Sequence, residues 1–492
     1  MRHRTRSVCV LVVLLLGVQC ANEKPKADGP PDEPGPIPGV SGAFRWYAEL
    51  TPGDPVGDSF AVSKAGRTAF AFSPLRAGTV AGVPFNHSGA GGVKSNYDLL
   101  VAVLESTGKL AWKRTFSTAE VESATAVTFD DAGDVYVAGL LKDNQDGLDF
   151  GDGVSVGVGP GELTSFLVKL RGTDGKALWA LGIISGERYV RPMCGIFRKE
   201  LQVRGGVGVL GCVFTVSDVA QEHLLLVTRT GTTEVRPVGL GANGVVLSFD
   251  PSSGQPRATY VLGGAESVLR TLAVTDAGGV VLGARLRQGT IVDSEGSTPL
   301  VLTAPGCLVA ALGPNLKPLH RRVLGGSIAE TDCEPEDVVL AGNGRVLVGG
   351  QGTGNLDQGD GVVGQGTFGF VGTLHSDLSN ADAFERYADQ RVFGMAVDAW
   401  GQSFVGLSRE EPALSFHYTK RDASGTVVHT SKDQVADASA RFPYPLLNMR
   451  GLAVDASGAP TLLGVTGGPF VFDDGLHGSN EARSCFAVRF AP

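Results

Sequence analysis

Charged residues are scarce in this chain. They make up 19% of its 492 residues, and no basic run occurs after the first six. The formal charge is −9, and it becomes −12 if a cleaved leader removes Arg2, Arg4 and Arg6. A diffuse negative charge disfavours nucleic acid and anionic lipid surfaces as partners. We therefore expect no nucleic-acid partner.

Common metal, redox and hydrolase motifs are also missing. The sequence has no Cys-x-x-Cys and no His-Glu-x-x-His, and its histidines are scattered. A zinc or thiol-redox centre is not expected. Gly153-Val-Ser155-Val-Gly157 fits Gly-x-Ser-x-Gly, but that nucleophile lies between a strand and a helix, whereas Ser155 lies in a glycine-rich stretch. We assign no catalytic, cofactor-binding or metal-binding residue.

Calcium is the one ion that the sequence brings into question. Residues 143–153 are rich in Asp and Gly, and oxygen ligands at that density could hold Ca²⁺. The spacing differs from that of the EF-hand loop. Related pieces recur at Asp357 to Gly361 and at Asp473 to Gly475. We therefore favour a repeated turn with solvated carboxylates over a calcium site.

Glycine, by contrast, is abundant. The chain has 70 Gly and 26 Pro, and hydrophobic residues make up 42%. That apolar content can form a large core, which argues against a disordered chain. Glycine and β-branched residues at this density oppose long helices. The composition therefore favours an all-β fold.

The first 41 residues resemble the leader and stalk of a bacterial lipoprotein. Met1 to Arg6 is basic, and Ser7 to Val18 is apolar but too short to span a membrane. Cys20 follows, at the place where the family carries its lipid, although Gln19 precedes it where a small residue is usual. An ordinary cleaved signal is the alternative. We expect a signal peptide over 1–19, lipidation of Cys20, and a Pro-rich linker over 20–41.

One pattern recurs along the rest of the chain. Two alternating apolar positions precede a turn that ends in Gly, and a second apolar run follows. The copies begin at Phe60, Val127, Leu272, Val338, Met395 and Leu452, with a looser one at Leu201. Each copy has a second half of similar design, such as Leu99 to Val103 followed by Leu110-Ala-Trp112. Period-2 alternation with Gly-bearing turns predicts antiparallel meanders.

These copies predict a seven-bladed β-propeller of four-stranded antiparallel blades over residues 42–492. The first strand, Gly42 to Trp46, resembles a fourth strand, and the last, Cys485 to Phe490, resembles a third. The N- and C-terminal strands would therefore close one blade. Trp112 and Trp179 follow Gly-x-x-Leu turns, and we interpret them as packing residues of outer strands.

The repeat is similar to the β-propeller repeats of bacterial surface lipoproteins. Gly133-Asp-Val-Tyr-Val-Ala-Gly139 and Ser165-Phe-Leu-Val-Lys-Leu170, with Gly175 and Leu178-Trp179, carry that resemblance. The family is known mainly as a scaffold. The resemblance therefore implies a fold and no shared active site.

The blade pattern also places the cysteines. Five follow Cys20, so at least one stays outside any disulfide within the chain. Blade links and second-to-third-strand loops lie at the same end of a propeller. This blade model places Cys194 near Cys212 at that end, and it places Cys307 near Cys333. We expect these two disulfides, with Cys485 left single.

We expect a non-enzymatic exported lipoprotein, a monomeric binding or scaffold propeller at the cell envelope. Its partners would be the membrane, through the anchor, and an unidentified protein or glycan. The longest loops, around 75–97 and 139–164, lie at the end of the propeller that the blade links share, and that face is the expected binding surface. A lyase or hydrolase with a site in the channel is one alternative; the small or apolar residues Ala61, Thr128, Ala273, Val339, Ala396 and Ala453 of the inner strands argue against it. An envelope assembly factor is another.

Overall fold

The computed structural model divides the chain into two units, residues 1–37 and 38–492. It describes residues 42–492 except for 52–55, 75, 88–96, 119, 143–146, 159–162, 187–189, 198, 326–331, 343, 355, 358–361, 364–365, 380, 410–413, 436–446, 467–469, 473–474 and 478–483. The expected signal peptide, Cys20 and the Pro-rich linker lie outside the described residues. No helix among the described residues has the length and apolar character of a membrane span.

The described chain consists of successive antiparallel sheets. Each sheet is named here by its innermost strand. The first three contain, in chain order, β2 (Val56–Val62), β3 (Thr68–Ser73), β6 (Leu99–Leu104) and β7 (Leu110–Phe116); β8 (Val121–Phe129), β9 (Val135–Lys142), β12 (Leu163–Leu170) and β13 (Ala177–Ser185); β14 (Met193–Cys194), β15 (Leu201–Arg204), β16 (Val207–Val216), β19 (Gly241–Phe249) and β20 (Pro256–Gly264).

The remaining sheets follow the same order. They contain β21 (Ser267–Val274), β22 (Val280–Leu286), β25 (Gly306–Leu312) and β26 (Pro318–Gly325); β27 (Asp332–Leu340), β28 (Val346–Thr353), β31 (Thr367–Leu374) and β32 (Ala381–Ala388); β33 (Arg391–Val397), β34 (Ser403–Arg409), β35 (Ser415–Arg421), β36 (Val427–Thr430) and β37 (Gln434–Val435); β38 (Leu447–Val454), β39 (Pro460–Thr466), β42 (Ser484–Phe490) and β1 (Phe44–Thr51).

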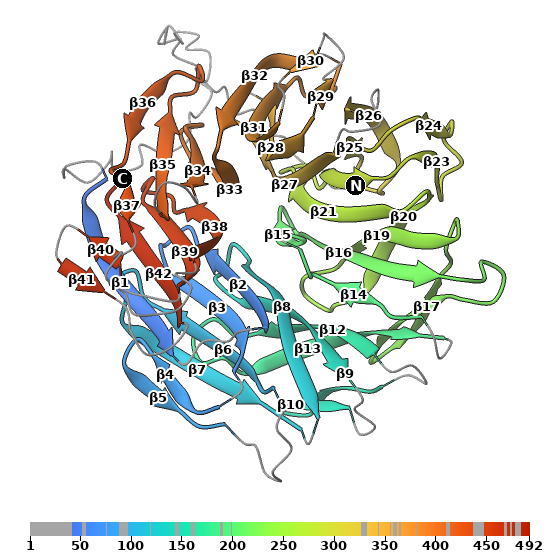
Figure 1. Cartoon of the computed structure of the whole chain (residues 1–492). Coiled ribbons are helices and arrows are strands. Elements are labelled where there is room, and N and C mark those ends of the chain that lie inside the picture. Colours follow the sequence, from blue (N-terminus) through green and yellow to red (C-terminus); the bar gives the residue numbers. More distant parts are fainter. Residues whose placement is uncertain are drawn as a thin grey trace, which may run out of the picture. The chain divides into compact units, whose positions relative to one another are not determined.

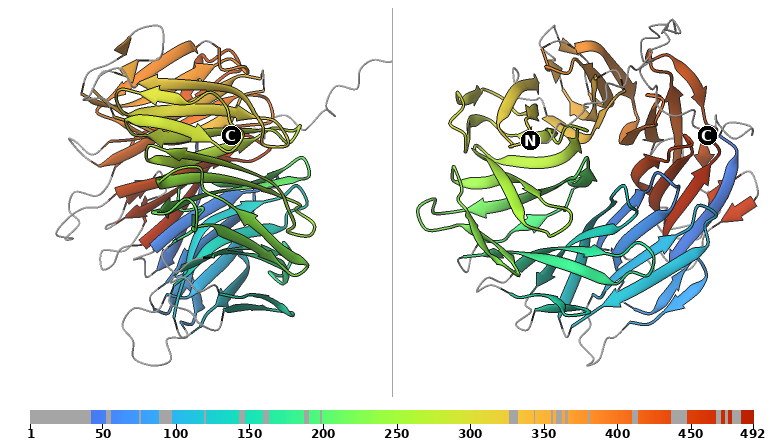
Figure 2. Two further views of the ribbon diagram at one scale, coloured as in Figure 1. Left: turned by 90° about the vertical axis from the view of Figure 1, so that its right-hand side faces the viewer. Right: turned by 180° about the vertical axis from the view of Figure 1, so that it is seen from behind.

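These sheets form a ring, which identifies the fold as a β-propeller. The innermost strands β2, β8, β15, β21, β27, β33 and β38 contact one another in series, and β38 contacts β2. Figure 1 shows the sheets around one centre, and Figure 2 shows them from the side and from behind. The ends close the ring as the sequence predicts, because β1 pairs with β42 from Phe44↔Phe490 to Leu50↔Cys485.

Antiparallel order gives the ring two different ends. In the β21 sheet, Ser267 at the start of β21 pairs with Leu286 at the end of β22. Gly306 at the start of β25 pairs with Gly325 at the end of β26. The links between sheets and the second-to-third connections therefore share one end, which we call the link face. The tight turns lie at the other end, the turn face.

The prediction of seven blades with four strands each is wrong. The sheets named by β2, β21 and β27 have four strands, but those named by β8 and β38 have six, that of β33 has five and that of β15 has seven. Most of the excess comes from β-hairpins in the second-to-third connections. These hairpins add to the sheet of the preceding blade, a tertiary pairing that leaves no repeat pattern in the sequence.

Three such hairpins extend the outer edge of the preceding sheet. They are β4 (Gly78–Val80) with β5 (Val83–Phe85), which pairs with β1; β17 (Leu224–Thr228) with β18 (Gly231–Val235), which pairs with β13; and β23 (Gly289–Asp293) with β24 (Leu300–Leu302), which pairs with β20. Edge strands with unpaired backbone groups are prone to aggregate. The added strands cover such edges.

Three further hairpins contact a preceding edge without joining its sheet. They are β10 (Leu148–Gly151) with β11 (Val154–Val156) at β7, β29 (Leu356–Asp357) with β30 (Val362–Val363) at β26, and β40 (Phe470–Phe472) with β41 (Gly475–His477) at β37. The described parts of 75–97 and 139–164 are therefore largely used for packing between blades. The face at which these loops lie stays the predicted binding surface.

Turns of one design join the first and second strands. Asp130 Oδ1 accepts hydrogen bonds from the amides of Ala132 and Asp134, and Asp398 and Asp455 repeat this arrangement. The glycine that ends each turn, such as Gly133, has a positive φ. Such a φ favours glycine, which explains the repeated glycine in the sequence.

Both expected disulfides are confirmed. Cys194 bonds to Cys212 and Cys307 bonds to Cys333. Cys212 lies within β16, directly opposite Cys194, rather than at the end of its strand. Cys485 is buried in β42 and is outside these bonds. Two disulfides indicate a protein that matures in an oxidising, exported or extracellular environment.

Candidate functional site

The inner strands carry a β-bulge near their link-face ends. The extra residue lies two positions before the first apolar residue of the repeat. Bulges are found at Thr125, Arg270, Glu336, Phe393 and Arg450. A bulge redirects side chains locally. Charged side chains therefore stand at the link-face end of otherwise apolar strands.

In the β15 sheet the bulge is replaced by a longer interruption. β14 and β15 both pair with β16, and residues 195–200 lie between them. Lys199 has a φ of 54° and occupies the same repeat position, two before Leu201. Its carbonyl accepts a hydrogen bond from Leu272 N at 3.3 Å. This segment therefore leaves its own sheet and contacts the next one.

Lys199 reaches beyond the neighbouring sheet. Its Nζ lies 2.5 Å from Asp337 Oδ2 and also donates to the carbonyl of Met395. Asp337 Oδ2 accepts a further hydrogen bond from Met395 N at 2.7 Å. The contact joins strands β27 and β33 to the segment before β15.

Arg270 is the centre of a second cluster. Its Nη2 lies 2.5 Å from Glu334 Oε1 and 3.6 Å from Glu336 Oε1. Its guanidinium stacks on the ring of Phe197, 4.1 Å from the ring centroid. Cation–π contacts and ion pairs both restrict an arginine. Arg270 is therefore held in a fixed position between elements of three sheets.

Two more arginines lie at the end of the adjacent strand, Arg285 within β22 and Arg287 just after it. Arg285 bonds to both oxygens of Asp332, with Nη2–Oδ2 at 2.6 Å, and Arg287 Nε lies 2.7 Å from Glu266 Oε2. Val268 is directly opposite Arg285.

These residues enclose a small pocket at the link face. Its volume is about 160 Å³, and it is lined by Phe197, Glu266, Val268, Arg270, Arg285 and Arg287. Typical ligand pockets are about 300–1,000 Å³. The pocket therefore suits one functional group of a ligand better than a large molecule.

Glu200 lies behind the wall of the pocket. Its Oε2 accepts a hydrogen bond from Phe197 N at 2.8 Å, and its Oε1 is buried with no hydrogen-bond partner among the described residues. Burial raises the pKa of Glu200 well above its usual value, and Arg270 opposes that shift. Glu200 therefore favours its uncharged form.

Both disulfides flank this site. Cys194–Cys212 crosses β14 and β16 at the start of segment 195–200. Cys307 is paired with Arg285 in the β21 sheet, and Cys333 follows Asp332 in β27. The second disulfide thus joins β25 to β27, next to the Arg285–Asp332 ion pair between β22 and β27. Covalent links hold the pocket on two sides.

The expectation of a largely apolar inner surface is therefore incomplete. It rests on the middle positions, such as Ala273, and overlooks the bulged position. The sequence does contain a signal there, because that position is occupied by Asp58, Thr125, Lys199, Arg270, Glu336, Phe393 and Arg450. A charged residue at the same place in most copies marks the mouth of the ring.

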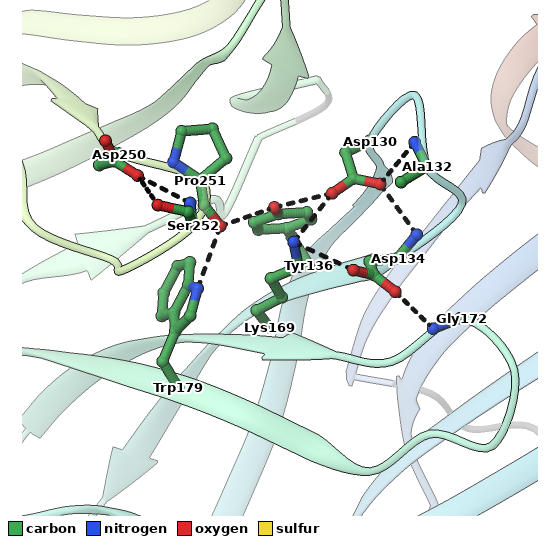
Figure 3. A network of polar contacts seen from close by, with 10 residues as sticks. All are labelled: Asp130, Ala132, Asp134, Tyr136, Lys169, Gly172, Trp179, Asp250, Pro251 and Ser252. Atoms are coloured by element: carbon green, nitrogen blue, oxygen red, sulfur yellow. Dashed lines mark hydrogen bonds and ion pairs between the residues drawn. The ribbon is translucent and has the colours of Figure 1, made fainter.

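A second polar network lies on the turn face and joins the β8 and β15 sheets (Figure 3). Lys169 Nζ lies 3.0 Å from Asp130 Oδ2 and 3.1 Å from Asp134 Oδ2. The Tyr136 hydroxyl is 2.9 Å from Asp130 Oδ2, and Trp179 Nε1 donates to the Pro251 carbonyl at 3.1 Å. These groups bond to one another, which indicates a joint between blades rather than a site.

Three of the four tryptophans form a series of such contacts between blades. Each donates its indole N–H to a turn carbonyl of the next sheet: Trp46 to Ser106, Trp112 to Gly172 and Trp179 to Pro251. Trp46 and Trp112 are buried. Their interpretation as packing residues is confirmed.

The Asp- and Gly-rich segment 143–153, in which the sequence favours a turn over a calcium site, is only partly described. Residues 143–146 lie outside the described part, and the rest forms the β10–β11 hairpin, in which Asp149 Oδ1 accepts from Gly151 N at 2.8 Å. Ser155 is exposed in β11. No group of three or more His, Cys, Asp or Glu in the described ranges is arranged to hold a metal ion.

Comparison with known proteins adds no family. No protein-family model and no curated protein matches the chain. Solved structures with a similar fold include the Cps50 (Swd1) β-propeller domain of Myceliophteria thermophila, with 9% identity, a TM-score of 0.40, and coverage of 91% of this chain and 100% of that one. A protein of unknown function from Dyadobacter fermentans has 11% identity, a TM-score of 0.40, and coverage of 92% and 100%.

Proposed function

We propose that this protein is an exported, lipid-anchored propeller that binds a ligand or partner at its link face without catalysing a reaction. The observation that carries the proposal is the pocket beside Arg270. Arg270 is held there by an ion pair and by stacking on Phe197, and Arg285 by two hydrogen bonds to Asp332. Preorganised polar groups of this kind reduce the ordering cost of binding.

The arrangement suits recognition better than proton transfer. A general acid or base needs a group whose proton is exchanged with a substrate. In this pocket Arg270, Arg285 and Arg287 are each paired with a carboxylate, and Arg side chains do not deprotonate in proteins. We therefore prefer a binding role to a lyase or hydrolase.

Export and anchoring rest on two separate observations. The disulfides fit an oxidising compartment, and the leader places Cys20 directly after a short apolar run. Expression of the full chain with its own leader in a Gram-negative host tests the anchor. We expect Cys20→Ser to move the protein from the membrane fraction to the soluble fraction, and Cys9→Ser to leave it in the membrane. Equal distribution of the two variants would reject lipidation at Cys20.

Binding is tested with the mature chain on glycan and peptide arrays. We expect a discrete set of ligands whose signal is lost in Arg287→Glu, on the link face. Arg257→Glu reverses an exposed charge elsewhere, where Arg257 pairs with Asp250 at 2.6 Å, and we expect it to retain binding. Equal loss in both variants would indicate nonspecific charge effects and reject the link-face assignment. Turnover of an array ligand would reject the non-enzymatic role.

A further inference from the structure

We propose that the pocket beside Arg270 binds the carboxylate group of a small acidic ligand. This inference rests on the proposed binding function and names the ligand chemistry. The lining contains three guanidinium groups and one carboxylate, from Glu266. The carboxylates that pair with Arg270 and Arg285, on Glu334 and Asp332, lie outside the lining, so the pocket itself presents mainly guanidinium groups.

The arginines have hydrogen-bond donors to spare. The ion pair of Arg287 uses Nε, the close contacts of Arg270 use Nη2, and Arg285 bonds to Asp332 through Nε and Nη2. Each guanidinium has five N–H donors in a planar fork. The remaining donors, including Nη1 of Arg285, form no hydrogen bond with any described residue. An oxyanion is the chemical group that such donors recognise.

The positions of the arginines favour a planar group. Arg285 lies in β22, Arg287 follows the end of that strand, Arg270 lies in the adjacent β21, and all three line the pocket. A carboxylate accepts two parallel N–H bonds from a guanidinium fork. Phe197 and Val268 supply an apolar wall for the first carbon atoms of the ligand. The small volume excludes more than one such group.

Glu266 competes with the ligand carboxylate for Arg287. Its side chain is 46% exposed and that of Arg287 is 60% exposed, so this surface ion pair is weak and easily exchanged. An incoming carboxylate can replace Glu266 at Arg287 without a change of the fold. The affinity should therefore fall with added salt, because the contact is exposed.

The test uses calorimetric titration of the mature chain at low salt. The acidic probes are glucuronate, which presents a sugar acid, and N-acetylglycine, which presents a peptide-like carboxylate. Glucose and N-acetylglycinamide are their neutral counterparts, and inorganic phosphate is a different oxyanion. We expect one or both acids to bind and the neutral compounds not to bind. Preference between the two acids distinguishes a saccharide source from a peptide source.

Three variants separate the site from general charge. We expect Arg287→Gln to weaken binding by about tenfold, as expected for loss of one charge-assisted contact, and Glu266→Gln to strengthen it severalfold. Arg257→Gln, the matched control, should have no effect. Thermal melting verifies that all three variants are folded.

Several outcomes would overturn the assignment. These are no binding of either acid at tens of millimolar, equal binding of neutral compounds, tighter binding of phosphate, or an unchanged affinity in Arg287→Gln. Array ligands that still bind the link face in any of these cases would leave the proposed function intact. Loss of array binding together with acid binding would reject both.

Discussion

Lys199 and Asp337 form an ion pair that bridges the β21 sheet, with 2.5 Å between Nζ and Oδ2. Lys199 precedes β15, Asp337 lies in β27, and the β21 sheet stands between them. Asp337 is 1% exposed and also binds Met395 N at the start of the next repeat. One carboxylate therefore connects three parts of the ring.

Removal of the ammonium group should destabilise the fold. In Lys199→Met the buried Asp337 carboxylate loses its cation, and we expect a loss of about 2–4 kcal/mol in the free energy of unfolding. Urea titration measures it. The double variant Lys199→Met/Asp337→Asn should recover part of the loss, because no buried charge then lacks its partner. A single variant as stable as the wild type would contradict this role.

The two disulfides should contribute similarly to stability. They close loops with sequence separations of 18 and 26 residues, and loop-closure entropy assigns each about 3 kcal/mol. We expect Cys194→Ser/Cys212→Ser and Cys307→Ser/Cys333→Ser to lower the unfolding free energy by comparable amounts. Unfolding under non-reducing conditions measures this. In a Cys9→Ser/Cys20→Ser background, a thiol titration of the denatured protein should find one thiol, that of Cys485; five would refute both bonds.

Substitution of Gly254 tests the contact between Trp179 and the turn of the next sheet. Its φ is 74°, and a Cβ there would lie 2.6 Å from Trp179 Cε3. Gly133 has a similar φ of 84°, but a Cβ at that residue would have nothing within 4 Å. Gly133→Ala should cost about 1–2 kcal/mol from backbone strain alone.

We expect Gly254→Ala to cost about 1–3 kcal/mol more, because it adds overpacking against the indole. Chemical denaturation of both variants measures the difference, and tryptophan fluorescence should shift only in Gly254→Ala. Equal costs in the two variants would show that the indole is not held against this turn.

Glu122 should make stability depend on pH. Burial raises the pKa of Glu122 to about 7 from an ordinary value of 4.5, although Thr118 N donates to its Oε2 at 3.1 Å. The folded state therefore binds the proton more tightly than the unfolded chain. The stabilisation that protonated Glu122 gives the folded state is fully present below about pH 4.5 and is lost as the pH rises through about 7.

The variant Glu122→Gln should abolish that part of the pH dependence. One pKa unit corresponds to about 1.4 kcal/mol, so the difference between wild type and variant should change by up to about 3 kcal/mol between pH 4.5 and 8. Unfolding at several pH values measures it. The comparison is needed because burial also raises the pKa of Asp398. Parallel curves for the two proteins would exclude Glu122 as the source.

The repeat made the main strands predictable. The first strands end where the apolar pattern ends, at residues such as Val274 and Val454, and the turn glycines have the positive φ that the pattern implies. The pairing of β1 with β42 was also predictable, because the first strand resembles the fourth strand of a blade and the last strand resembles the third. These features depend on local periodicity, which a single sequence displays.

The mouth of the ring was harder to predict. A bulge adds one residue and breaks the period-2 alternation, so Arg270 and Glu336 fall outside a pattern defined by apolar positions. The ion pair of Lys199 depends on a six-residue interruption whose path is set by tertiary contacts. The hairpins such as β4–β5 pair with another blade, and their strands are only three residues long. The repeat position of Lys199, Arg270 and Glu336 is visible in the sequence, but their ion-pair partners and the pairing of the hairpins are set by tertiary contacts.

Arg489 should be important for closure of the ring. It lies in β42, 7% exposed, where it donates to the Gly66 carbonyl at 3.0 Å and pairs with Asp455 Oδ2. Gly66 is in the first turn of the chain and Asp455 in the last sheet, so Arg489 joins the two ends. Lys169 makes the corresponding pair with Asp130 in the β8 sheet.

We expect Arg489→Met to lower the unfolding free energy by about 3–5 kcal/mol, because Asp455 stays buried without its cation. The double variant Arg489→Met/Asp455→Asn should recover part of the lost unfolding free energy, because the asparagine side-chain oxygen can still accept the hydrogen bonds of the turn. Hydrogen exchange should show faster exchange in β1 and β42 of the single variant than in β8 and β9. Uniform acceleration in all strands would mean that Arg489 supports the whole fold equally and has no specific part in joining the ends.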